Sequence, residues 1–228
     1  MNVRNKIKNS RLLSSLIRPI ARFLYLLKTR DYLSKCVTIE NHGYGNIKKE
    51  VSGSLHKVII GKGTTLSKPI VRIKGTSNKL IIGENCKIGP NCEFFLEGNN
   101  IFISIGANTS FTNNVEVNAQ EDNSIIQIGE DCMISNHIII RTSDSHPIYD
   151  IDTGKRINPA KNVTIGNHVW IAPHSTIMKG AVINNGSIVG SNTVVTKVIP
   201  NNSLAVGIPA KVVKQNIKWT KEMIIPAQ

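Results

Sequence analysis

Large aliphatic residues recur at every sixth position between residues 165 and 195. They are Ile165, Ile171, Ile177, Ile183, Val189 and Val195. The fifth residue of each of the first five hexapeptides is small or slim: Val169, Ser175, Ala181, Ser187 and Thr193. A period of six matches neither the 3.6-residue turn of an amphipathic helix nor the two-residue alternation of a hairpin strand. Short fixed repeats are typical of β-helices, so each hexapeptide is predicted to form a short strand and a corner.

The same hexapeptide occurs earlier in the chain at wider spacing. Ile60, Ile82, Ile105 and Ile128 each precede a glycine and lie 22, 23 and 23 residues apart. Three hexapeptides account for 18 residues, so each interval corresponds to one triangular coil with a few extra residues of turn. Stacked aliphatic side chains would build a core that no single coil could form alone. The pattern therefore predicts an all-β chain, a parallel β-helix.

The main break in the pattern lies between Ile128 and Ile165, 37 residues apart, and this gap predicts a loop inserted at residues 145–162. Long excursions from a rigid scaffold usually carry function, so the loop is the predicted site of chemistry. His146 lies in it, and an imidazole can accept a proton near neutral pH. The alternative is a solvated loop histidine.

The chain divides into three predicted segments. Residues 1–54 form a basic N-terminal helical segment and lead-in, residues 55–214 the β-helix with its inserted loop, and residues 215–228 a C-terminal tail. Of the net charge of +13, +8 falls within residues 1–35, where apolar residues recur at helical spacing. Arg18 and Arg22 interrupt the apolar run, which argues against a membrane-spanning helix.

Two interpretations of this basic amphipathic helix stay open. It packs on the β-helix or on a neighbouring subunit, or it contacts anionic lipid at the inner face of a membrane. Binding to nucleic acid is disfavoured, because no recognised motif or aromatic platform accompanies the basic residues.

Three of the four cysteines occupy the fifth position of a hexapeptide: Cys86, Cys92 and Cys132. They are predicted to pack as small apolar residues, and Cys36 stands apart. No CxxC spacing is present, and free thiols suit a reducing compartment.

The hexapeptide run and the segments DSHP, VWIAPHSTIMKGAVI and GIPAKVVK resemble the left-handed β-helix acyltransferases. Within them, the chain is most similar to the sugar and polysaccharide O-acetyltransferases of bacterial capsule and lipopolysaccharide clusters. The resemblance covers about residues 55–214. It implies a left-handed winding, a homotrimer, and acetyl-CoA bound in the grooves between neighbouring β-helices. The implied reaction is acetyl-CoA-dependent O-acetylation of a sugar in a surface polysaccharide or its precursor, in the cytoplasm or peripherally at the inner membrane.

The resemblance also implies roles for single residues. His146 matches the family's general base, and Asp144 or a main-chain carbonyl would hold its tautomer. Trp170 matches a tryptophan that serves the reaction in polysialic acid O-acetyltransferases; the alternative for its outward-facing indole is simple packing.

Coenzyme A carries phosphates and a slender pantetheine arm, which call for cations and for close backbone approach. The candidate contacts are Lys179, Lys197 and Lys211 for the phosphates, and Ala172, Gly180 and Gly190 for the arm. The alternative for each lysine is a solvated surface charge. Arg141 and Arg156 could hold an anionic acceptor such as a sialic or uronic acid, or could be solvated.

The sequence disfavours three other functions. A γ-class carbonic anhydrase binds zinc with three histidines, but His137, His168 and His174 do not have the needed spacing, so no metal is predicted. A non-catalytic β-helix would need no insertion with a histidine. An amino-sugar N-acyltransferase often carries a nucleotide-binding domain ahead of the β-helix, and about 55 residues are too few for one.

Overall fold

The computed structural model describes Pro19 and residues 36–223 of the 228-residue chain. The basic helix predicted for residues 1–35 lies outside this part, apart from Pro19, so its role in packing or lipid contact stays a prediction. Within the part that is described, no helix combines the length and the apolar character needed to cross a membrane.

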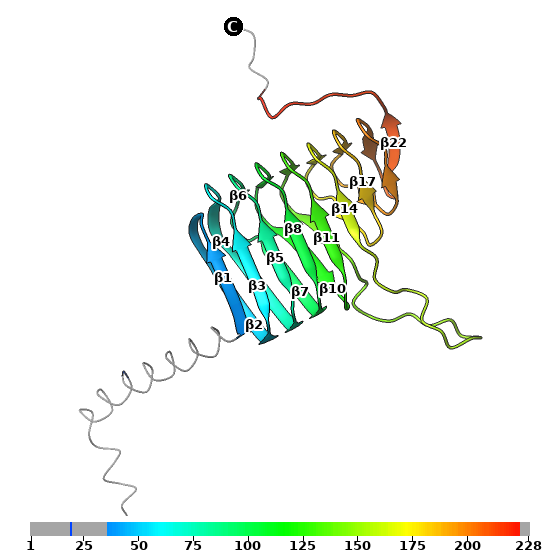
Figure 1. The fold of residues 1–228 in the computed structure, drawn as a ribbon. Coiled ribbons are helices and arrows are strands. Elements are labelled where there is room, and N and C mark those ends of the chain that lie inside the picture. Colours follow the sequence, from blue (N-terminus) through cyan, green and yellow to red (C-terminus); the bar gives the residue numbers. More distant parts are fainter. Residues whose placement is uncertain (1–18, 20–35, 224–228) are drawn as a thin grey trace, which may run out of the picture.

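The described chain winds into a parallel β-helix with three faces (Figure 1). The first face is an eight-stranded sheet. Its strands are β1 (Val37–Asn41), β3 (His56–Ile60), β5 (Lys79–Ile82), β8 (Phe102–Ile105), β11 (Ile125–Ile128), β14 (Val163–Ile165), β17 (Val182–Ile183) and β20 (Val198–Ile199). The predicted all-β parallel β-helix is confirmed.

The other two faces share one sheet, because the long strands β2 (Tyr44–Ser54) and β4 (Thr65–Thr76) run across both. The second face continues through β6 (Lys87–Ile88), β9 (Ser110–Phe111), β12 (Met133–Ile134), β15 (Trp170–Ile171), β18 (Ile188–Val189) and β21 (Leu204–Val206). The third continues through β7 (Glu93–Asn99), β10 (Val115–Gln120), β13 (Ile138–Arg141), β16 (Thr176–Ile177) and β19 (Val194–Val195). An antiparallel strand, β22 (Lys211–Lys214), pairs with β21 and ends the ladder.

One column of isoleucines runs through the core of the first face. Each is the register partner of the next, one coil away, and each is at most 3% exposed. The column consists of Ile60, Ile82, Ile105, Ile128, Ile165, Ile183 and Ile199. Burying one such side chain stabilises a fold by about 1.5–3 kcal/mol, so this stacking is a main source of stability.

The cysteines predicted to pack in the core do so. Cys86, Cys92 and Cys132 are fully buried and free. Burial raises the pKa of all three thiols, that of Cys132 to about 11, so they stay protonated at neutral pH.

The corners of the coils contain residues in the left-handed backbone region. The first corner, between the first and second faces, includes Asp131 (φ 58°) and His168 (φ 53°), and the second corner, between the second and third faces, includes His137 (φ 56°) and His174 (φ 62°). Aspartate and histidine are among the non-glycine residues found most often at positive φ, so the backbone of the corners accounts for the presence of these histidines. His168 therefore lies on a different corner from the stacked pair His137 and His174, whose ring centroids are 4.8 Å apart.

The β-helix begins earlier than predicted. Residues 37–54 lack the Ile-Gly signature, yet β1 pairs with β3 and β2 pairs with β4, so the ladder starts at Val37 and not at residue 55. Part of the tail also belongs to the folded unit, because Trp219 is 6% exposed.

The inserted loop leaves the β-helix between β13 and β14, at the third corner, where the third face meets the first. Figure 1 shows it projecting well beyond the coils. A single antiparallel bridge joins Tyr149 to Arg156 within it.

Candidate active site

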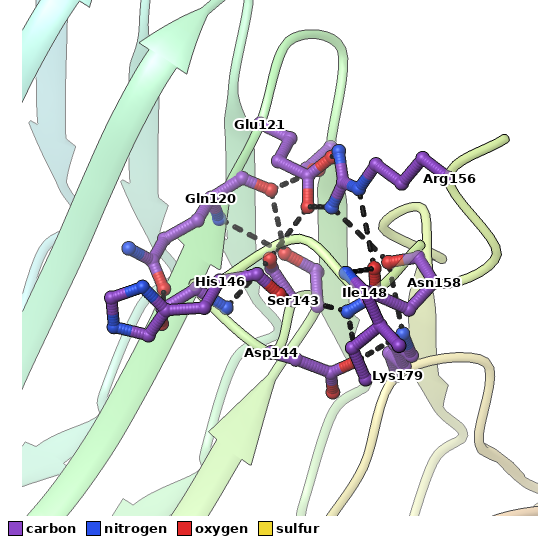
Figure 2. A network of polar contacts seen from close by, with 12 residues as sticks. Gln120, Glu121, Ser143, Asp144, His146, Ile148, Arg156, Asn158 and Lys179 are labelled. Carbon is purple, nitrogen blue, oxygen red and sulfur yellow. Dashed lines mark hydrogen bonds and ion pairs between the residues drawn. The ribbon is translucent and has the colours of Figure 1, made fainter. Parts of the chain in front are cut away.

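Asn158 is the centre of a hydrogen-bond network at the base of the loop (Figure 2). It is 7% exposed. Its amide nitrogen donates to the carboxylate of Asp144 and to the carbonyl of His146, both at 2.9 Å. Its amide oxygen accepts from the backbone N–H of Ile148 at 2.6 Å and from Nε of Arg156 at 3.3 Å. All four bonds that a carboxamide can form are made, and they hold the backbone on both sides of Pro147.

Asp144 and Lys179 tie this network to the coil that follows. The ammonium of Lys179 donates to Oδ2 of Asp144 at 2.5 Å and to the carbonyl of Asn158 at 3.1 Å. The bond from Lys179 lowers the pKa of Asp144, with a smaller contribution from Asn158. Asp144 was expected to orient an imidazole, but its carboxylate bonds to Lys179 and Asn158. The ammonium of Lys179, expected to meet a phosphate, is engaged by a carboxylate of its own chain.

Arg156 and Glu121 tie the loop to the coil that precedes it. Two guanidinium nitrogens of Arg156 donate to the two oxygens of Glu121, each at 2.7 Å. Glu121 also accepts from Oγ of Ser143 at 2.6 Å. The bond with Arg156 is the main cause that lowers the pKa of Glu121 to about 2. Arg156 was expected to bind an anionic acceptor, but its fork is occupied by this carboxylate.

Replacing Glu121 with glutamine should loosen the loop without unfolding the β-helix. Because the pKa of Glu121 is lowered from 4.5 to about 2, the ion pair stabilises the folded loop above about pH 4.5, and this contribution is lost as the pH falls toward 2. A partly exposed pair contributes about 1 kcal/mol, so loop amides should exchange about fivefold faster in the variant at pH 7. Hydrogen exchange of peptides from 148–158 measures this.

The matched control is Glu84→Gln, since Glu84 is exposed and forms no ion pair with the described residues. Its loop exchange should equal that of the unchanged protein. Equal exchange in the Glu121 variant at pH 7 would show that the pair does not hold the loop.

His146 itself is exposed on the loop. Figure 2 shows its imidazole directed away from Asp144 and Lys179, and neither ring nitrogen forms a hydrogen bond with the described residues. Because the backbone is fixed and the imidazole is open, the unprotonated ring nitrogen of either tautomer is free to accept a substrate proton.

Arg141 is placed differently from Arg156. Its Nε donates to the carbonyl of Ser143 at 2.6 Å and a terminal nitrogen donates to Oγ of Ser145 at 3.1 Å. Among the described residues it forms no ion pair with a carboxylate, so its positive charge stays available to an anion.

Trp170 lies on another side of the β-helix from His146. It opens β15 on the second face, beside the first corner, whereas His146 projects from the third corner. The chain runs along β14 between these two points. Within one chain, the structure does not bring the two predicted catalytic side chains together.

The residues predicted to contact coenzyme A also lie at three separate places in the fold. They occupy the third corner (Lys179, Gly180 and Lys197), the second corner (Ala172 and Gly190) and strand β22 (Lys211). Ala172 and Gly190 lie one coil apart, because the residues before them are register partners. Their roles stay predictions.

Comparison with known proteins places this chain among acetyltransferases. The bacterial transferase hexapeptide family (six repeats) matches residues 162–197. A solved polysialic acid O-acetyltransferase, OatWY, is 33% identical, with a TM-score of 0.70 over 83% of this chain and 94% of that one. The polySia-specific acetyltransferase NeuO is 30% identical, with a TM-score of 0.52 over 84% of this chain and 85% of that one.

The chain belongs to the hexapeptide-repeat O-acetyltransferase family. Among curated relatives, the polysialic acid O-acetyltransferase of Escherichia coli O1:K1 / APEC is 49% identical over 79 residues, 35% of this chain and 26% of the relative. That of Neisseria meningitidis is 44% identical over 82 residues, 36% of this chain and 38% of the relative. The matched stretches thus span well under half the length of both curated relatives.

Several residues that shape the site of this hexapeptide-repeat acetyltransferase were not predicted. Asn158, Glu121 and Ser143 form most of the bonds that hold the loop. The sequence offered little signal for them. Asn158 is one polar residue among many in the loop, and Glu121 lies at a corner a coil earlier, outside the insertion.

Proposed function

We propose that this chain is an acetyl-CoA-dependent O-acetyltransferase that modifies a sugar hydroxyl of an anionic bacterial surface polysaccharide or its precursor. The observation that carries the proposal is His146, an open imidazole whose backbone is held by the buried amide of Asn158. The polysialic acid O-acetyltransferases that cover most of this chain support the reaction and the class of acceptor.

The proposed chemistry is a direct acyl transfer. A ring nitrogen of His146 takes the proton from the sugar hydroxyl while the oxygen attacks the thioester carbonyl of acetyl-CoA. A backbone N–H stabilises the oxyanion that forms. The intermediate then expels the thiolate of coenzyme A, which receives the proton, and the acetyl ester stays on the sugar.

The complete site would require assembly. Trp170 and His146 occupy different corners of one chain, so a shared site needs Trp170 of a neighbouring subunit. We therefore include a homotrimer in the proposal, with acetyl-CoA in the grooves between subunits. The residues proposed to line its path are those predicted from the sequence, except that Lys179 acts first as the partner of Asp144. The enzyme would act in the cytoplasm or at the inner face of the membrane.

Arg141 supports an anionic acceptor. It lies at the end of β13, next to the loop, and its guanidinium forms no ion pair with a carboxylate of the described residues. A sugar carboxylate could take that position.

The test is an acetylation assay with acetyl-CoA and a panel of purified acceptors: acidic capsular polysaccharides, neutral polysaccharides, nucleotide sugars and amino sugars. We expect release of free coenzyme A with at least one acidic polysaccharide, and an acetyl group that mild alkali removes, as esters but not amides allow. An alkali-stable acetyl group on an amino sugar would instead establish N-acylation. No transfer to any acidic acceptor would refute the proposal.

A further inference from the structure

The C-terminal tail, residues 215–223, runs back along the first corner of the β-helix (Figure 1). The N–H of Ile217 donates to the carbonyl of Asn202 at 3.0 Å, near the end of the ladder. Lys221 reaches coils nearer the N-terminus, donating to Oδ1 of Asp131 at 2.6 Å and to the carbonyl of Asn108 at 2.9 Å. An extended chain rises about 3.3 Å per residue and coils are about 4.8 Å apart, so a few residues span several coils.

Trp219 is the buried anchor of this tail. Its indole N–H donates to the carbonyl of His168 at 3.0 Å, and its own carbonyl lies 3.1 Å from Nε2 of His168. The two rings are stacked, with centroids 4.1 Å apart and planes 11° from parallel. The other ring nitrogen of His168 lies 2.7 Å from Oδ2 of Asp131. Two hydrogen bonds and a stacked partner therefore fix the orientation of Trp219.

Trp219 in turn packs beside Trp170. Their ring centroids are 6.0 Å apart and their planes are tilted by 45°. Trp170 is only half-buried, and the one hydrogen bond of its indole within the described residues is a long one of 3.4 Å to Oγ of Ser135. The outward indole of Trp170 is thus held mainly by packing against its neighbours. The indole of Trp219 is held more firmly, by a hydrogen bond and a stacked ring.

We infer that Trp219 is a positioning residue, which holds the indole of Trp170 in the orientation that acetyl transfer needs. This inference rests on the proposed function, in which Trp170 of a neighbouring subunit completes the shared site. The docked tail then contributes to the active site through Trp219. A misplaced catalytic group can lower a rate by up to about 100-fold even when the change lies outside the chemistry.

A double-mutant cycle in the full chain tests the inference. Trp219→Ala should lower kcat by roughly tenfold with little change in the KM for acetyl-CoA. In a Trp170→Phe background, the same change should have almost no further effect, because the two residues act through one indole. Trp219→Phe, which keeps an aromatic ring beside Trp170, should recover most of the activity. If the effects of the two replacements multiply, Trp219 has only a structural role and the inference is overturned.

Fluorescence provides a readout that is independent of turnover, because the chain contains two tryptophans. In Trp219→Phe all emission comes from Trp170, and it should keep the anisotropy of a fixed indole. In Trp219→Ala the emission of Trp170 should shift to the red and lose anisotropy. If Trp219→Ala and Trp219→Phe have the same emission maximum and anisotropy, the positioning contact is refuted, whatever the activity.

Further variants distinguish loss of the positioning contact from a folding defect and from failure of the proposed function. Met223→Ala alters a side chain that is 88% exposed in the same tail and should leave kcat unchanged. If Trp219→Ala does not fold, Trp219→Leu keeps apolar volume and is judged by the same criteria. Absence of transfer by the unchanged protein would refute the proposed function and this inference together. Normal kcat in a variant with a loosened Trp170 would refute the inference alone.

Discussion

Replacing His146 with alanine is expected to lower the rate of acetyl transfer by at least about 10²–10⁴-fold, the usual contribution of a general base. The β-helix should stay intact, because the imidazole is exposed and bonds to none of the described residues. Affinity for acetyl-CoA should also persist, since the thioester is proposed to bind in the groove. Initial rates of coenzyme A release, with equilibrium binding of acetyl-CoA, measure both quantities.

The matched control is His42→Ala, which removes an exposed histidine between β1 and β2, many coils from the loop. Its turnover should equal that of the unchanged protein. Near-normal turnover of the His146 variant would remove the basis of the proposed mechanism, while equal losses in both variants would point to a general effect on folding.

Replacing Asn158 with alanine is expected to lower kcat by about 100-fold, although the side chain of Asn158 is buried. Its four hydrogen bonds hold the carbonyl of His146 and the N–H of Ile148, and the variant leaves the carboxylate of Asp144 with one fewer donor. Losing such buried bonds costs about 1–3 kcal/mol, which falls on the loop and not on the stacked core. The KM for acetyl-CoA should change little.

Kinetics and hydrogen exchange of the loop together check this prediction. The loop amides should exchange faster in Asn158→Ala, whereas Asn201→Ala, at an exposed corner position, should change neither quantity. Faster exchange with unchanged kcat would show that the catalytic base does not need an ordered loop.

The loop is held from two directions along the helix axis. Glu121 lies on the coil before it and Lys179 on the coil after it, and each partner is 35 residues away in sequence from the loop residue it binds. Charge-assisted bonds on both sides restrict the motion of the loop where it leaves the β-helix. This arrangement explains how a long projecting loop can present one side chain reproducibly.

Much of the fold could be predicted from the sequence because its signal is local. The isoleucine at each sixth position, the small fifth residue and the break before Ile165 predicted the coils, the buried cysteines and the insertion. The start of the β-helix was missed, because strands β1 and β2 lack the Ile-Gly signature and are recruited by pairing with β3 and β4. The docking of the tail was missed for a similar reason, since Trp219 is a single residue without a repeat.

The sequence by itself determined that the chain stacks hexapeptide coils and interrupts them once, with a histidine in the interruption. A repeat encodes its own neighbours, because each inward side chain meets its copy one coil away. Only the tertiary structure decided which charged residues around the loop are available. Arg156 and Lys179 pair with Glu121 and Asp144. Among the described residues, Arg141 pairs with no carboxylate and the imidazole of His146 forms no hydrogen bond. No local pattern encodes that choice, because it depends on which corners of successive coils come within hydrogen-bonding distance in space.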